Sequence, residues 1–160
     1  MIRIVIAEDH YITRRGITAL LADNPQLKVV GEGWAGDQML ALMAAQRPDV
    51  LITDLQMPAQ AAEPQGALME PVTVLRRVRA DFPQAAIMVI SQEQDIHTVR
   101  NLAELGVRGY MLKSDDFAAT LGTAVEMLHR GLLYFSPEIR EVIIAAPPLP
   151  IRQALTGQPA

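Results

Sequence analysis

Short apolar runs alternate with amphipathic stretches along most of this chain. The runs are rich in β-branched side chains and are bounded by polar residues, prolines or glycines, which is typical of buried strands. We expect strands at residues 2–7, 27–33, 50–53, 86–90 and 109–112. The intervening stretches place apolar residues at helical spacing and end at proline or glycine. We expect helices at residues 10–22, 36–47, 72–81, 95–105 and 114–130, and a shorter one from Ser136 to Ala145.

Strands that alternate with helices predict an α/β fold in which a parallel sheet is covered on both faces. The strands are apolar almost throughout, as expected when both faces of a sheet are buried. Because crossovers between parallel strands are right-handed, few topologies remain. We predict a three-layer, doubly wound (βα)5 sheet of flavodoxin-like order 2-1-3-4-5, whose crevice lies at the carboxyl ends of strands 1 and 3.

Polar side chains follow four of the predicted strands at their carboxyl ends. Glu8 and Asp9 follow the first strand, Asp54 the third, Ser91 the fourth and Lys113 the fifth. Each alone is ordinary, since carboxylates and hydroxyls often cap helices or stabilise turns. Because the predicted order brings these strand ends to one edge of the sheet, we expect the side chains to meet in one crevice.

Composition narrows the classes of protein that fit. The chain has 160 residues, of which half are apolar and a fifth charged, so we expect a soluble globular protein. Its formal net charge of −4 argues against a non-specific nucleic-acid surface. It has no cysteine, which excludes disulfides, thiolate metal sites and cysteine nucleophiles. No run is long enough to span a bilayer and no signal peptide is evident, so we expect a cytoplasmic protein without a membrane partner.

Three carboxylates in one crevice would repel one another unless a cation joined them. Oxygen ligands without thiolates favour a hard ion, and few carboxylates suit Mg²⁺, which commonly recruits phosphate oxygens. In such a site Asp54 would be the nucleophile, because aspartate can carry a covalent phosphoryl group. Lys113 would supply a positive charge and Ser91 a hydroxyl donor. His10 follows the acids, and we interpret it as a residue at a helix start rather than a metal ligand.

Four motifs carry a resemblance to a known family, and they occur in the family's order on the expected elements. They are Ala7-Glu8-Asp9-His10, Asp54 with Met57-Pro58, Ser91, and Gly109-Tyr110-Met111-Leu112-Lys113. The chain resembles the receiver domain of two-component response regulators from about residue 2 to residue 131, and the first and last motifs are closest to the NarL/FixJ-like subfamily.

The resemblance implies a function and a role for each site residue. Asp54 would accept a phosphoryl group from a sensor histidine kinase, with Lys113 and Ser91 contacting that group. Mg²⁺ would be the cofactor, held by Glu8, Asp9, Asp54 and the backbone carbonyl of Gln56. Ser91 and Tyr110 would form the switch pair. Such a protein is not an enzyme for a separate metabolite, because it catalyses only its own phosphorylation and dephosphorylation.

One segment departs from the family pattern. Pro58 is followed by a stretch, residues 59–71, that is several residues longer than usual and lacks the expected glycine. A loop of this length inside a compact domain is usually functional or mobile. The family pattern therefore does not determine the residue at which the following helix starts.

The same resemblance suggests a division of the chain. We expect a receiver domain at residues 1–131, a short helical extension at 132–146 and a proline-rich linker or tail at 147–160. Regulators of this subfamily usually carry a DNA-binding output domain, and we expect it to be missing here, so DNA contact would require a domain outside this chain. The apolar faces of the first and last helices are compatible with a homodimer. The alternative is a stand-alone receiver or a pseudo-receiver that acts as a protein–protein interaction module. A flavin-binding protein is set aside, because acids follow the first strand where a phosphate cradle would lie.

Overall fold

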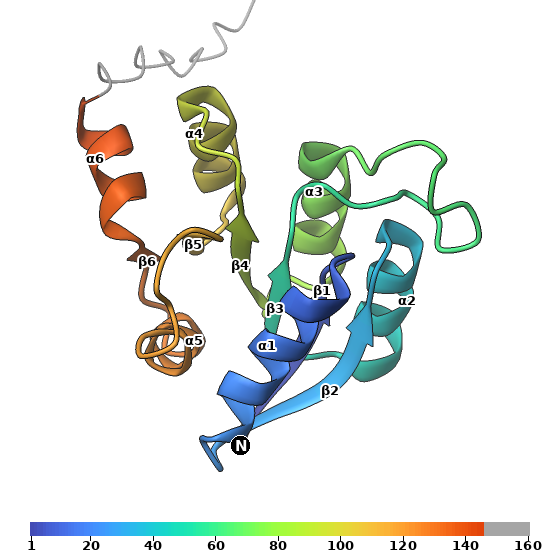
Figure 1. Cartoon of the computed structure of the whole chain (residues 1–160), viewed down its shortest axis with the longest axis horizontal. Coiled ribbons are helices and arrows are strands. Elements are labelled where there is room, and N and C mark those ends of the chain that lie inside the picture. Colours follow the sequence, from blue (N-terminus) through green and yellow to red (C-terminus); the bar gives the residue numbers. More distant parts are fainter. Residues whose placement is uncertain (146–160) are drawn as a thin grey trace, which may run out of the picture.

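The computed structural model describes residues 1–145, and the predicted linker or tail at 147–160 lies outside the described residues. Six parallel strands form one sheet in the order β2-β1-β3-β4-β5-β6 (Figure 1). The strands are β1 (Ile2–Ala7), β2 (Leu27–Gly33), β3 (Val50–Thr53), β4 (Ala86–Ser91), β5 (Gly109–Leu112) and β6 (Tyr134–Phe135). The helices are α1 (Tyr11–Ala22), α2 (Gly36–Gln46), α3 (Pro71–Asp81), α4 (Ile96–Leu105), α5 (Leu121–His129) and α6 (Pro137–Ala145). The predicted α/β class and the order 2-1-3-4-5 are confirmed, and β6 is added beside β5.

Helices cover both faces of the sheet, and the strands alternate their side chains between two apolar cores. Ile4 and Ile6 of β1 belong to the core that includes buried residues of α1 and α5. Val5 and Ala7 of the same strand belong to the other core, which includes buried residues of α2, α3, α4 and α6. The period of two along a strand therefore divides one apolar run between two layers of helices. None of the helices in residues 1–145 has the length and apolar character needed to span a membrane.

Two predictions about the second half of the chain need correction. The helix expected from Ser114 begins only at Leu121, and the residues between them form turns. Asp115 does not sit in a first helical turn, because its carboxylate accepts a hydrogen bond from the backbone N–H of Leu112 at 2.8 Å. This bond turns the aspartate back toward the end of β5 and delays the helix. The sequence also gave no indication of β6, whose two residues are too few for a periodic pattern.

The long segment after Pro58 forms a hairpin-like loop rather than an irregular excursion. Backbone N–H groups of Ala59 and Met69 donate to the carbonyls of Ala67 and Met57, at 2.8 Å in both cases, which closes the loop at its base. The carbonyls of Pro58 and Ala59 accept hydrogen bonds of 2.9 Å from the first two backbone N–H groups of α2. Helix α2 has no side-chain cap at Ala35, so the loop satisfies donors that would otherwise lack partners.

Helix α3 begins at Pro71, one residue before the predicted start at Val72. Proline is favoured at the first helical position, because its missing N–H would have no partner there and its φ angle suits a helix. The extended loop therefore ends where the sequence itself supplies a helix-starting residue.

The last described helix, α6, packs against the sheet edge beyond β5. Its residue Ile139 is fully buried and belongs to the same core as Tyr110 of β5 and Val99 of α4. The short strand β6 precedes this helix. Between them, the backbone N–H of Ser136 donates to the carbonyl of Tyr110 at 2.9 Å, which ties the start of α6 to β5. Figure 1 shows α6 beside α4, and contacts join α6 to both α4 and β5.

Candidate functional site

The carboxyl ends of four strands place the predicted site residues around one pocket. Backbone hydrogen bonds fix these ends: Asp54 N–H donates to the Ala7 carbonyl, and Lys113 N–H donates to the Ser91 carbonyl, each at 2.9 Å. The pocket has a volume of about 190 Å³. Its lining residues are Asp9, His10, Asp54, Gln56, Leu68, Ser91, Gln92 and Lys113. Strand order alone thus brings together residues that are more than a hundred positions apart in the sequence.

Lys113 joins the two buried carboxylates of the site. Its Nζ lies 2.8 Å from Asp54 Oδ2, and 3.1 Å and 2.9 Å from the two oxygens of Glu8. The side chains of Glu8, Asp54 and Lys113 are only 1%, 4% and 11% exposed. Burial alone would lower the pKa of Lys113, but its hydrogen bonds to Asp54 and Glu8 outweigh burial and raise that pKa. Lys113 is therefore a fixed positive charge at the bottom of the pocket.

Burial raises the pKa of Glu8, and the negative charge of Asp54 adds to that effect. Hydrogen bonds from the backbone N–H of His10 and from Lys113 act in the opposite direction without cancelling it. Removing a charge from water costs free energy, and a second carboxylate nearby adds repulsion. The site therefore holds negative charge that its single lysine only partly compensates.

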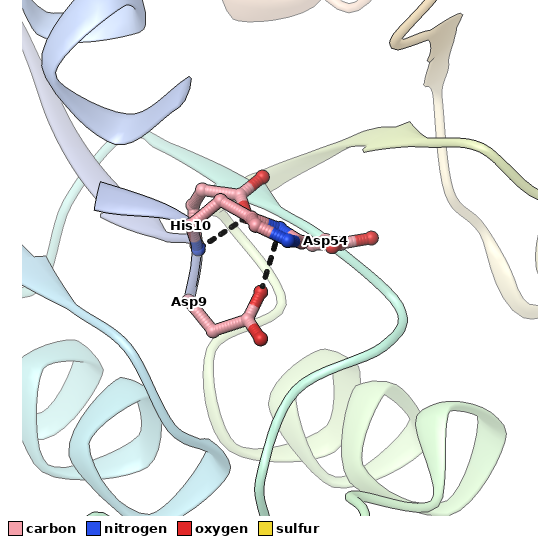
Figure 2. A group of neighbouring side chains, drawn as sticks. Asp9, His10 and Asp54 are labelled. Carbon is pink, nitrogen blue, oxygen red and sulfur yellow. Dashed lines mark hydrogen bonds and ion pairs between the residues drawn. The ribbon is translucent and has the colours of Figure 1, made fainter. Parts of the chain in front are cut away.

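The acidic cluster is suited to a divalent cation. One ligand atom from each of Glu8, Asp9, His10 and Asp54 lies within 4.8 Å of the others, and Figure 2 shows Asp9, His10 and Asp54 gathered at one place. Oδ1 of Asp9 and Oε2 of Glu8 are buried and make no hydrogen bond, although Oε2 is close enough to Lys113 for an ion pair. Buried oxygens without hydrogen-bond donors are available as metal ligands, and an all-oxygen carboxylate set suits Mg²⁺.

The backbone around Asp54 holds its carboxylate in position. The N–H of Leu55 donates to Oδ1 of Asp54 at 2.6 Å, while Oδ2 faces Lys113. The hydroxyl of Thr53 donates to the carbonyl of Asp54 at 2.8 Å. Gln56 is exposed and lines the same pocket as Asp9 and Asp54. The role of the Gln56 carbonyl as a metal ligand stays a prediction.

Ser91 and Tyr110 occupy neighbouring strands between the pocket and helix α4. Ser91 lines the pocket, and its Oγ accepts a hydrogen bond from the backbone N–H of Glu93 at 3.2 Å. Tyr110 is fully buried, and its hydroxyl donates to the carbonyl of Glu93 at 2.8 Å. Burial raises the pKa of Tyr110 and keeps the phenol protonated as a donor. The loop at Glu93 therefore contacts both predicted switch residues.

Two residues that line the pocket, His10 and Leu68, were not among the predicted site residues. His10 was interpreted as a helix-start residue, and it is the N-terminal cap residue of α1; its Nδ1 nevertheless lies 3.4 Å from carboxylate oxygens of both Glu8 and Asp9. Leu68 reaches the pocket from the extended loop although its side chain is largely exposed. The histidine could have been included from its position after two acids. Leu68 could not, because its approach depends on how the loop closes.

Fold and site together define a class of protein. A flavodoxin-like sheet whose switch point presents acids and a lysine, in place of a phosphate-cradling loop, is suited to a hard cation and an oxyanion. The profile of the response regulator receiver domain matches residues 4–124. The chain belongs to the response regulator receiver domain family.

Named relatives agree with this membership. The chain is 33% identical to the response regulator GacA of Pseudomonas viridiflava, over 88% of this chain and 61% of that protein. It is 30% identical to the transcriptional regulatory protein DegU of Brevibacillus brevis, over 89% of this chain and 56% of that protein. These are regulators of the NarL/FixJ type, which confirms the predicted subfamily. The chain spans about three-fifths of the length of these curated relatives.

Solved structures agree on the fold. A LuxR-family two-component response regulator from Aurantimonas sp. SI85-9A1 superposes with a TM-score of 0.77 at 28% identity, covering 91% of this chain and 96% of that one. The isolated receiver domain of RcsB from Salmonella enterica serovar Typhimurium gives a TM-score of 0.78 at 23% identity, covering 89% of this chain and 98% of that one. The second likeness supports the fold alone.

Proposed function

We propose that this chain is the phosphoacceptor receiver of a two-component response regulator, phosphorylated on Asp54 by a sensor histidine kinase with Mg²⁺. One observation carries the proposal: four strand ends bring Asp9, Asp54, Ser91 and Lys113 to a single pocket, with Lys113 Nζ 2.8 Å from Oδ2 of the proposed acceptor. A shared structural role such as helix capping would not require these side chains to converge.

The chemistry would be phosphoryl transfer to a carboxylate. An oxygen of Asp54 forms a bond to the phosphorus of the donor, and the bond from phosphorus to the phosphohistidine nitrogen breaks, its electron pair leaving with the imidazole. Lys113 offsets the charge of the transferred group, and the Ser91 hydroxyl can donate to one of its oxygens. Glu8, Asp9, Asp54 and the Gln56 carbonyl would hold Mg²⁺, which neutralises charge on the phosphate oxygens when bound.

The switch would follow from the same geometry. A phosphoryl group on Asp54 offers acceptor oxygens to the Ser91 hydroxyl, which now accepts from the N–H of Glu93. Movement of Ser91 would disturb the loop whose carbonyl receives the Tyr110 hydroxyl bond. Phosphorylation then shifts an equilibrium between two arrangements of this loop and the adjoining face formed by α4, β5 and α5.

The larger protein is also part of the proposal. DegU is named a transcriptional regulatory protein, and it is longer than this chain. We propose that the receiver regulates transcription through a DNA-binding domain outside this chain, and that it acts in the cytoplasm as a homodimer. The partner at Asp54 is the histidine kinase, whose identity would be found by phosphotransfer profiling.

Incubation with a small phosphodonor such as acetyl phosphate tests the proposal. In the presence of Mg²⁺ we expect intact-mass spectrometry to detect one added phosphoryl group on the wild-type chain. Chelation by EDTA should prevent the adduct, because the acidic cluster then lacks its cation. Absence of any adduct with Mg²⁺ and excess donor would contradict the phosphoacceptor assignment and favour the pseudo-receiver alternative.

Magnesium binding should also stabilise the fold. A ligand that binds only the native state at about ten times its Kd raises the free energy of unfolding by about 1.4 kcal/mol. We expect this increase for the wild-type chain in urea unfolding with Mg²⁺, and little of it in an Asp9→Asn variant, because Oδ1 of Asp9 is one of the buried oxygens without a donor.

An Asp23→Asn variant is a matched control, since Asp23 is the C-terminal cap residue of α1 and lies outside the cluster. It should respond to Mg²⁺ as the wild type does. Equal stabilisation of the Asp9→Asn variant would show that the ion binds elsewhere.

A further inference from the structure

A second polar pocket lies at the amino ends of the strands, opposite the carboxyl ends that carry Asp54. It has a volume of about 240 Å³, and it is formed where β3, β4 and β5 begin. Its lining residues are Asp49, Arg79, Pro83, Gln84, Ala85, Ala86, Arg108, Leu128, His129, Arg130 and Gly131. Three arginines from three separate segments thus line one small pocket, in a chain whose formal net charge is −4.

These arginines are not neutralised by neighbouring acids. The side chains of Arg108 and Arg130 make no ion pair or hydrogen bond with any residue in 1–145, and Arg79 makes no ion pair there. The pocket contains one acid, Asp49, whose Oδ2 already accepts a hydrogen bond from the backbone N–H of Arg3 at 2.8 Å. Positive charge therefore exceeds negative charge in the pocket.

One of the three guanidinium groups, that of Arg79, is held in place by hydrogen bonds. Nη1 of Arg79 donates to the carbonyls of Pro83 and Ala85 at 3.0 Å and 3.4 Å, which leaves its remaining N–H groups for other partners. A Cβ at Gly106 would come within 3.0 Å of Arg79 Nε, and a Cβ at Gly131 within 3.2 Å of Arg108 Nη1. Both glycines also have positive φ angles, of 103° and 83°, so side chains are disfavoured where the arginines pass.

We propose that this pocket, defined here as the arginine pocket, binds a small phosphate-type anion of one or two phosphate groups. Guanidinium groups match the geometry of phosphate oxygens and can donate two parallel hydrogen bonds. Arg79, which is already held by hydrogen bonds, loses little side-chain freedom on binding. The volume lies below the roughly 300–1,000 Å³ of pockets for drug-sized ligands, which favours inorganic phosphate or diphosphate over a complete nucleotide.

Isothermal titration calorimetry with inorganic diphosphate tests the proposal directly. The titration uses the Asp54→Asn variant in EDTA at low ionic strength, so that neither phosphorylation nor Mg²⁺ contributes, and its outcome is independent of the proposed phosphoacceptor function. We expect saturable binding to one site, weaker binding of orthophosphate, and loss of affinity with added salt. Arg108→Gln and Arg130→Gln should each weaken binding by about tenfold, the effect of losing one hydrogen-bonded charge of about 1.4 kcal/mol.

Arg76→Gln is the matched control, because Arg76 carries the same charge on the exposed face of α3 and does not line the pocket. It should bind diphosphate as the parent does. Circular dichroism and thermal unfolding would confirm that the variants remain folded. Absence of saturable binding, equal affinity in the Arg108→Gln and Arg76→Gln variants, or equal binding of sulfate and diphosphate would each overturn the assignment of a phosphate-type ligand to the arginine pocket.

Discussion

Replacement of Asp54 by asparagine is expected to abolish the phosphoryl adduct completely. An amide oxygen is a poor nucleophile toward phosphorus, and the neighbouring carboxylates already have partners: both oxygens of Glu8 lie within 3.1 Å of Lys113 Nζ, and Oδ1 of Asp9 lies 3.4 Å from His10 Nδ1. The measurement is intact-mass spectrometry after incubation with acetyl phosphate and Mg²⁺, followed by peptide mapping of any product.

The variant should remain folded, because Lys113 keeps its contacts with Glu8 and one of three clustered negative charges is removed. Asp81→Asn is a suitable control: Asp81 is an exposed aspartate at the end of α3, paired only with Arg77 among the residues described. It should be phosphorylated like the wild type. An adduct that persisted in the Asp54→Asn variant would assign the acceptor to another carboxylate and remove the basis of the proposed function.

The convergence of the candidate site residues could be predicted from the sequence, because strand ends are local features and strand order follows from few rules. Apolar runs marked β1, β3, β4 and β5, and the residue after each run could be identified without tertiary information. Parallel strands with right-handed crossovers then place those ends on one edge. Convergence of Glu8, Asp54, Ser91 and Lys113 is therefore a consequence of topology, and the structure shows these residues at one place.

Features that depend on particular hydrogen bonds, either local or between distant segments, could not be predicted in the same way. Asp115 resembles an N-terminal helix residue, yet its carboxylate bonds back to Leu112, so α5 starts later than its composition indicates. The loop after Pro58 replaces a missing cap on α2, a relationship between segments some twenty residues apart. Leu68 reaches the pocket only because this loop is closed at its base. Such partners are visible only in three dimensions.

The edge strand β6 and the helix α6 lie beyond the predicted end of the receiver domain. The sequence places the end of the receiver domain at residue 131, whereas the packing of α6 involves the main core. Tyr110 and Ile139 belong to one cluster of buried residues, so the predicted switch tyrosine lies in the same core as this helix. If α6 contributes substantially to stability, a change in the packing of Tyr110 would also alter the packing of α6.

Replacing Ile139 by alanine tests this contribution and should cause the largest loss of stability among the variants considered. Ile139 is fully buried, and removing a buried isoleucine side chain to alanine typically costs about 2–5 kcal/mol through lost burial and the cavity left behind. We expect a decrease of that size in the free energy of unfolding, measured by urea denaturation in the absence of Mg²⁺, with a single cooperative transition.

Ile144→Ala provides the matched control, because Ile144 is the same residue type in the same helix but is 81% exposed. Its effect should stay within about 0.5 kcal/mol, as for most surface substitutions. Equal small effects of both variants would mean that α6 contributes little to the free energy of unfolding and that the folding unit ends before β6. A large effect of Ile139→Ala alone would mean that α6 is part of the receiver core, in the same cluster of buried residues as Tyr110.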